Sequence, residues 1–207
     1  VRYEMLLRKL ESKVNTLVGL SGSFFAARRE VCRNWSIELQ SDFNTLLNSI
    51  KLGLRGISDP ESIGYYKNIA DERKEYNRKI RTVLRGISVM MKNLSLLNPF
   101  RYGLFAWQLF SHKICRWLVP FFLILVFISN LFIIANSYFY VFTFILQVAF
   151  YFQAYTYFQG GKWRAQGAFV NLMKIPYFFV TVNLSILVAW WRYIRGERAT
   201  FWEPSKR

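Results

Sequence analysis

The chain changes character at Trp117, from a mixture of charged and apolar residues to long apolar runs. Residues 117–161 contain no charged side chain, and a second uncharged run covers 175–191. A helix rises about 1.5 Å per residue and a bilayer core is about 30 Å thick, so the first run is long enough for two crossings with a turn at 136–137. The pattern predicts transmembrane helices at about 117–135, 138–158 and 175–192.

Before Trp117, the spacing of apolar residues predicts amphipathic helices over 1–14, from Phe43 to a stop at Gly53, over 78–94 and over 104–116. Basic residues cover the rest of the third helix, so we expect it at the membrane interface, with its apolar stripe toward lipid or the transmembrane helices. That stripe consists of Ile80, Val83, Leu84, Ile87 and Met91. Short apolar runs broken by Gly and Ser predict a strand, a tight turn and a second strand or helix start over 17–30. Residues 55–66 predict two short strands around a Pro turn.

The charge of the chain limits the classes of partner that we expect. Residues 1–116 hold 20 Lys and Arg against 10 Asp and Glu, a surplus that suits an anionic leaflet, a nucleotide diphosphate or the inner side of a membrane. Nucleic acid is the least favoured partner and we expect none, because there is no zinc-ligand spacing, no recognisable nucleic-acid motif and no basic cluster outside the membrane-flanking helices. Cys32 and Cys115 imply no disulfide framework and favour a reduced, cytoplasmic setting. The loop 159–174 and the tail are both basic, so the charge rule leaves the side of the tail open.

Several short motifs then follow one another along the chain. They are Gly22-Ser23, Arg28-Arg29-Glu30, Ser41-Asp42-Phe43, Arg78-Lys79-Ile80-Arg81, Asn98-Pro99-Phe100, Ser111-His112-Lys113, Arg116-Trp117 and the closing Trp202-Glu203-Pro204-Ser205-Lys206-Arg207. In order and spacing the chain resembles the carboxyl-terminal half of membrane-bound family 2 glycosyltransferases, which include the cellulose, hyaluronan and poly-N-acetylglucosamine synthases. The resemblance extends over essentially the whole chain. It implies the end of an α/β catalytic domain of GT-A type over 1–76, interface helices over 77–116, a transmembrane region over 117–194 and a basic tail over 195–207.

The resemblance also implies a reaction, the inverting transfer of a hexosyl group from a nucleotide-sugar donor to a growing polysaccharide or other glycan of the cell envelope. Asp42 would be the general base, which takes the proton of the acceptor hydroxyl. Arg81 and Arg78 would bind the diphosphate, although Arg78 stands where the family has Gln and Thr82 where it has Trp. Without the resemblance, the favoured interpretation of Asp42 is a cap of the helix that begins at Phe43.

The acceptor would lie against a small-residue turn and an aromatic side chain. The resemblance places Gly22 and Ser23 under the acceptor sugar, and a glycine turn lets a ligand approach the backbone closely. Trp35, seven residues before Asp42, is a candidate for stacking on a sugar, with core packing as the alternative. His112 is the sole histidine of the chain, and we interpret it as an interface residue.

The donor half of such an enzyme is missing from these residues. We find no "DxD" motif, so the resemblance implies a Mg²⁺ or Mn²⁺ ion whose ligands lie outside this chain. The chain begins at Val1 inside a predicted helix, and we expect it to be incomplete and inactive alone. The expected location is the plasma (inner) membrane, multi-pass, with the catalytic part in the cytoplasm. The alternative is a non-catalytic membrane anchor or interaction protein, whose basic amphipathic helices bind lipid. A transporter subunit is a weaker alternative, because the spans contain no ionisable residue.

Overall fold

The structure is a computed structural model that describes residues 2–22, 24–36, 38–65, 72–159 and 168–198. These residues are helical or irregular, and no strand occurs among them. Two compact units can be distinguished. We call residues 1–117 with 189–207 the first unit, and residues 118–188 the second unit.

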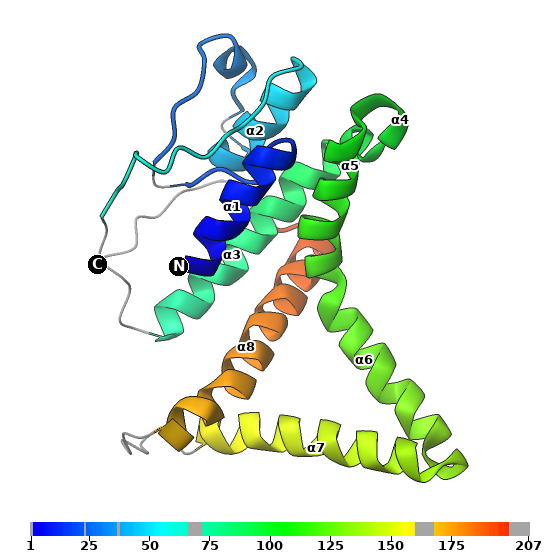
Figure 1. The fold of residues 1–207 in the computed structure, drawn as a ribbon. Helices are drawn as coiled ribbons and strands as arrows, with labels where there is room; N and C mark the ends of the chain where they lie inside the picture. The colour runs from blue at the N-terminus through cyan, green and yellow to red at the C-terminus, as the bar shows by residue number, and fades with distance from the viewer. Residues whose placement is uncertain (1, 23, 37, 66–71, 160–167, 199–207) are drawn as a thin grey trace. The chain divides into compact units, whose positions relative to one another are not determined.

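The helices follow one another from α1 to α8 (Figure 1). In order they are α1 (Arg2–Val14), the 3-10 helix η1 (Val31–Asn34), α2 (Ser41–Lys51), α3 (Glu72–Met91), the 3-10 helix η2 (Leu94–Leu97), α4 (Pro99–Tyr102), α5 (Leu104–Leu109), the π-helix η3 (Phe110–Ile114), α6 (Cys115–Ile133), the 3-10 helix η4 (Ile134–Asn136), α7 (Tyr138–Gln159) and α8 (Ala168–Ile194). The helix α6 begins in the first unit, and α8 ends in it.

The predicted ends of the helices in the first unit have local causes. α2 stops where predicted because Gly53 has a positive φ of 72°, a conformation that favours glycine. Its N–H donates to the carbonyl of Ile50 (3.0 Å). The start of α4 also has a local cause. The side chain of Asn98 accepts from the N–H of Phe100 at 3.0 Å and caps α4, which begins at Pro99.

The strands predicted over 17–30 and 55–66 are not formed by the described residues, which are coil and bends there. The two segments meet at one point instead. The N–H of Leu17 donates to the carbonyl of Gly56 (2.9 Å), and the Thr16 hydroxyl bonds both the N–H and the carbonyl of Gly56. A Cβ at Gly56 would lie 2.5 Å from Cδ1 of Leu46, so this crossing requires glycine. The α/β architecture expected for 1–76 is therefore absent from the described residues.

The core of the first unit forms around the apolar stripes of α2 and α3. Its fully buried side chains include Leu46, Leu47, Ile87, Met90, Leu96 and Leu109. The stripe predicted on α3 is also mostly inside: Ile80 and Leu84 are buried, Val83 is half-buried, and Met91 is 37% exposed. Because the protein itself covers most of this stripe, α3 does not offer it as a free apolar face.

The three predicted crossings are confirmed as helices that are long and apolar enough to span a membrane: Leu104–Asn136, Tyr138–Gln159 and Lys174–Ile194. Most of their apolar side chains in the second unit are exposed, which suits contact with lipid. Polar side chains between α6 and α7 bond to one another. The amide nitrogen of Asn130 donates to Oε1 of Gln147 (3.0 Å) and to the hydroxyl of Thr143 (3.2 Å).

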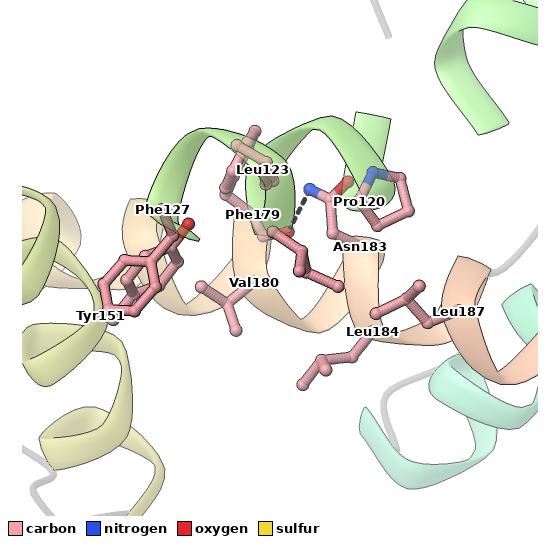
Figure 2. A pocket seen from close by; sticks show the side chains of 10 residues that line it. Pro120, Leu123, Phe127, Tyr151, Phe179, Val180, Asn183, Leu184 and Leu187 are labelled. Atoms are coloured by element: carbon pink, nitrogen blue, oxygen red, sulfur yellow. Dashed lines mark hydrogen bonds between the residues drawn. The ribbon is translucent and has the colours of Figure 1, made fainter. Parts of the chain in front are cut away.

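The second unit also contains an apolar pocket between α6, α7 and α8 (Figure 2). Its lining comprises Pro120, Leu123, Ile124, Phe127, Tyr151, Phe179, Val180, Asn183, Leu184 and Leu187. The one amide in this lining, that of Asn183, donates to the backbone oxygen of Phe179 at 2.9 Å. No lining residue carries a charge at neutral pH, and Tyr151 is the one lining residue with a titratable side chain.

Candidate active site

Asp42 lies in the first turn of α2, as the second residue of the helix. The predicted N-cap position is thus wrong by two residues, because Gln40 occupies it with an extended backbone and no side-chain cap bond. The carboxylate of Asp42 is half-buried and lies at the amino-terminal end of α2. The helix begins without help from this side chain, so the capping role does not account for Asp42.

Gly22 lies directly beside this carboxylate. A Cβ built on Gly22 would be 3.0 Å from Oδ2 of Asp42, so a larger residue would crowd the oxygen. The predicted acceptor-binding glycine and the predicted base, 20 residues apart in the sequence, thus lie side by side. Ser23, the other half of the predicted turn, lies outside the described residues. Trp35 is 53% exposed and follows η1 with an extended backbone, and no ring contact or hydrogen bond among the described residues links it to Asp42.

Arg85 on α3 brings positive charge toward Asp42. Burial lowers the pKa of Arg85, the nearby charge of Arg81 adds to that effect, and the negative charge of Asp42 opposes it. The Nε of Arg85 is buried without a hydrogen-bond partner, the sole such side-chain atom in the described part of the chain. An unsatisfied buried donor of this kind is uncommon in proteins and is often found at functional sites.

Arg78, the second predicted diphosphate ligand, is engaged differently. Its Nε and one terminal nitrogen donate to the two oxygens of Glu75 at 2.8 and 2.7 Å, one helical turn away. This fork lowers the pKa of the Glu75 carboxyl, with partial burial acting in the opposite direction. The structure therefore pairs Arg78 with its own helix, whereas Arg85 interacts electrostatically with Asp42 and Arg81 acts on Arg85.

Lys113, in the π-helix η3, completes the group of charges. Its Nζ lies 4.9 Å from the ring centroid of Phe43, the residue after Asp42. A Cβ at Gly19 would approach the same nitrogen to 3.1 Å. Asp42 and Glu11 interact electrostatically with this ammonium as negative charges. Four segments distant in the sequence thus converge here.

Polar contacts of α1 help to hold this arrangement. Oε1 of Glu11 lies 2.5 Å from Nδ1 of His112, and Oε2 accepts from the N–H of Val18 (3.3 Å). The side chain of Asn15 donates to Oε1 of Gln108 at 3.1 Å. These contacts fix the segment 15–22 against the region before α6, and His112 has a structural role beside the site.

Trp117 packs against α2 and α3 within the first unit. Its ring meets that of Phe43 edge to face, with centroids 6.5 Å apart. A Cβ at Gly86 would come within 2.9 Å of this indole, so glycine lets α3 approach it closely. The backbone oxygen of Trp117 accepts from the indole nitrogen of Trp190, at the end of α8 (3.1 Å).

The sequence predicted Asp42, Gly22 and Arg81 as site residues. The structure places Gly22 against the Asp42 carboxylate, and Arg81 acts electrostatically on Arg85. Sequence reasoning missed Arg85 and Lys113 as site residues. The signal for Arg85 was its spacing, since residues 78, 81 and 85 follow at intervals of three and four and share one side of α3. For Lys113 the signal was a charge placed just before the long apolar run.

Possible metal ligands do not gather in the part of the chain that the structure describes. No group of three or more His, Cys, Asp or Glu side chains there could hold a metal ion. Comparisons of the whole chain with protein-family models, with curated proteins and with solved structures gave no match.

Proposed function

We propose that this chain is the carboxyl-terminal part of an integral-membrane, inverting glycosyltransferase of family 2 type. It transfers a sugar from a nucleotide-sugar donor to a growing polysaccharide or other glycan. The observation that carries the proposal is the surroundings of Asp42. A half-buried carboxylate lies against Gly22, near the cations Arg85 and Lys113, without an ion pair within 4 Å among the described residues.

In this proposal Asp42 is the general base. Its carboxylate accepts the proton of the acceptor hydroxyl as that oxygen attacks the anomeric carbon of the donor sugar. The bond between this carbon and the diphosphate oxygen breaks on the opposite face, so the configuration inverts. Gly22 leaves room beside the carboxylate for the acceptor, because no Cβ occupies that space.

Arg81 and Arg85 stabilise the leaving group. A departing nucleoside diphosphate gains negative charge, and guanidinium groups donate paired hydrogen bonds to phosphate oxygens. The buried Nε of Arg85 has no hydrogen-bond partner among the described residues, so the chain itself does not satisfy this guanidinium. A divalent metal ion on the donor diphosphate would supply further charge stabilisation, and we assign no metal ligand to the described residues.

Two further parts of the proposal concern location. We place the first unit on the cytoplasmic side of the plasma (inner) membrane, where nucleotide sugars are present and where basic residues are favoured. The apolar helices lie in the bilayer. The competing proposal is a non-catalytic anchor whose basic amphipathic helices bind lipid. Burial of Ile80, Leu84 and Ile87 weighs against it for α3, because a helix that lies on a membrane exposes its apolar stripe.

The substitution Asp42→Asn tests the proposal in the full-length protein. Asn keeps the shape and polarity of the side chain but cannot take up the acceptor proton. General-base catalysis contributes about 10²–10⁴-fold, and we expect sugar transfer to fall by that order while donor binding and thermal stability are kept. Release of nucleoside diphosphate and formation of glycan from a panel of donors are the measurements.

Asp59→Asn is the matched control. The Asp59 carboxylate is exposed in a loop and accepts hydrogen bonds from Ser62 and Glu61, so this change should leave transfer at the wild-type rate. Transfer by Asp42→Asn within about twofold of wild type would sink the assignment of Asp42 as base.

A further inference from the structure

Lys113 is half-buried, yet it forms no hydrogen bond or ion pair with any residue that the structure describes. Its nearest partner is apolar: Nζ lies over the ring of Phe43, 4.9 Å from the centroid. A lysine ammonium has three donors, and burying a charge without a paired acceptor is unfavourable. The protein retains a cation here that it does not neutralise by direct contact.

The backbone around Lys113 is adapted to its position. The side chain projects from the π-helix η3, an irregular turn that often marks functional sites. Gly19 faces its ammonium, and a Cβ there would come within 3.1 Å of Nζ. Gly22, three residues later, faces Asp42 in the same way. One short segment therefore leaves room for both the ammonium and the carboxylate.

The neighbouring acids do not serve as counter-ions for Lys113 at close range. Both act on it electrostatically, but the carboxylate of Glu11 is taken up by His112 and by the N–H of Val18. Asp42 forms no ion pair with Lys113 within 4 Å. The positive charges of Arg8 and Arg116 also repel the ammonium, so a bound anion would be stabilised at this position.

We propose that Lys113 is a phosphate-binding residue of the site around Asp42. Its ammonium would hold a phosphate group, either of the donor diphosphate or of a lipid-linked acceptor. The inference rests on the proposed function, because the phosphate would stand beside the general base. A phosphate oxygen would supply the acceptors that the ammonium lacks, and Gly19 keeps the approach to it open.

The direct test measures phosphate binding rather than catalysis. Inorganic pyrophosphate is titrated into the full-length protein in neutral detergent with EDTA, so that metal-dependent binding elsewhere does not contribute. Lys113→Met keeps an unbranched side chain against Phe43 but removes the charge. We expect its pyrophosphate affinity to fall about tenfold or more, the loss of one charge-assisted hydrogen bond, while the thermal midpoint is unchanged.

A second arm distinguishes the source of the phosphate. The same variants are placed in phosphatidylcholine nanodiscs with and without phosphatidic acid, whose headgroup is a phosphomonoester. Weaker pyrophosphate binding by Lys113→Met assigns the residue to the donor diphosphate. If Lys113→Met loses binding only to phosphatidic acid, the residue is assigned to a lipid phosphate. Wild-type binding of both probes by Lys113→Met would overturn the inference and leave a cation–π contact with a structural role.

Three variants sharpen the result. Lys113→Arg should restore most of the affinity, because it restores the charge. Gly19→Ala keeps the charge but displaces the flexible ammonium by a few tenths of an ångström, so its affinity should lie between wild type and Lys113→Met. Lys92→Met is the matched control, since Lys92 pairs with the exposed Glu38 at 3.1 Å and should bind as wild type. If Asp42→Asn leaves sugar transfer intact while Lys113→Met loses phosphate binding, the proposed function is wrong but the phosphate-binding role of Lys113 is supported.

Discussion

Polar side chains between the helices of the second unit form hydrogen bonds with one another or with the backbone. In the first unit, by contrast, the charged side chains Asp42, Arg85 and Lys113 interact electrostatically without forming ion pairs among the described residues. Asn130 bonds to Gln147 and Thr143, and Asn183 bonds to the carbonyl of Phe179. Arg85, by contrast, keeps a buried Nε without a partner. Satisfied polar groups can be explained by stability alone. Unsatisfied charges destabilise a fold unless a ligand completes them, so the first unit is where we place the chemistry.

Among the variants that test this contrast between the two units, Arg85→Lys should lower sugar transfer the most. Lysine keeps the positive charge but loses the planar fork of donors that matches a diphosphate. Removing one donor that stabilises a developing anion lowers turnover by about 10²–10³-fold, and we expect a fall of about this size in nucleoside diphosphate release.

The control is Arg101→Lys, an identical exchange at an exposed position of α4. It should leave transfer unchanged, because the guanidinium of Arg101 stacks on Tyr102 and not on the site. If Arg85→Lys also transfers sugar at the wild-type rate, the unpaired Nε has no role in catalysis and the contrast between the units loses its functional meaning.

Asn130→Leu should have a smaller effect, and on stability rather than transfer. The change removes the bonds to Gln147 and Thr143 between α6 and α7. Interhelical hydrogen bonds in membranes contribute about 0.6–1.7 kcal/mol, and we expect a loss of that order in thermal or denaturant unfolding in detergent. Ser129→Ala, at the exposed neighbouring position, is the control. Unchanged stability together with reduced transfer would contradict our separation of a structural unit from a reactive one.

The sequence predicted the helices well because each is encoded by local spacing. The period of apolar residues located α1, α2 and α3, glycine at 53 located one helix end, and uncharged length located the spans. The strand predictions failed over 17–30 and 55–66, because short apolar runs broken by glycine also fit coil. In this protein such coil is held by isolated contacts, as between Leu17 and Gly56. A single crossing of this kind leaves no periodic pattern.

The candidate site was only partly predictable for a related reason. Asp42 and Gly22 were found through their motifs, but Lys113 is far from both in sequence and reaches them through the packing of η3 against Phe43. No local pattern encodes that approach. Arg78 illustrates the converse, since its position in a motif predicted a ligand contact and the structure shows a bidentate pair with Glu75.

Arg78→Met should produce the smallest effect, a pH-dependent change in stability. The hydrogen bond from Arg78 lowers the pKa of Glu75 below its usual value near 4.5. A depressed carboxyl pKa stabilises the folded state above the unfolded pKa, and this contribution disappears as the pH falls through the folded pKa. The side chain of Arg78 is 50% exposed, so solvent screens the pair, and we expect a loss of about 0.3–0.5 kcal/mol at neutral pH. Unfolding midpoints of wild type, Arg78→Met, Glu75→Gln and the double variant measure the coupling. The coupling should shrink as the pH falls through the lowered pKa of Glu75. A coupling as large in acid, with Glu75 protonated, as at pH 7 would show that the pair is not held by charge.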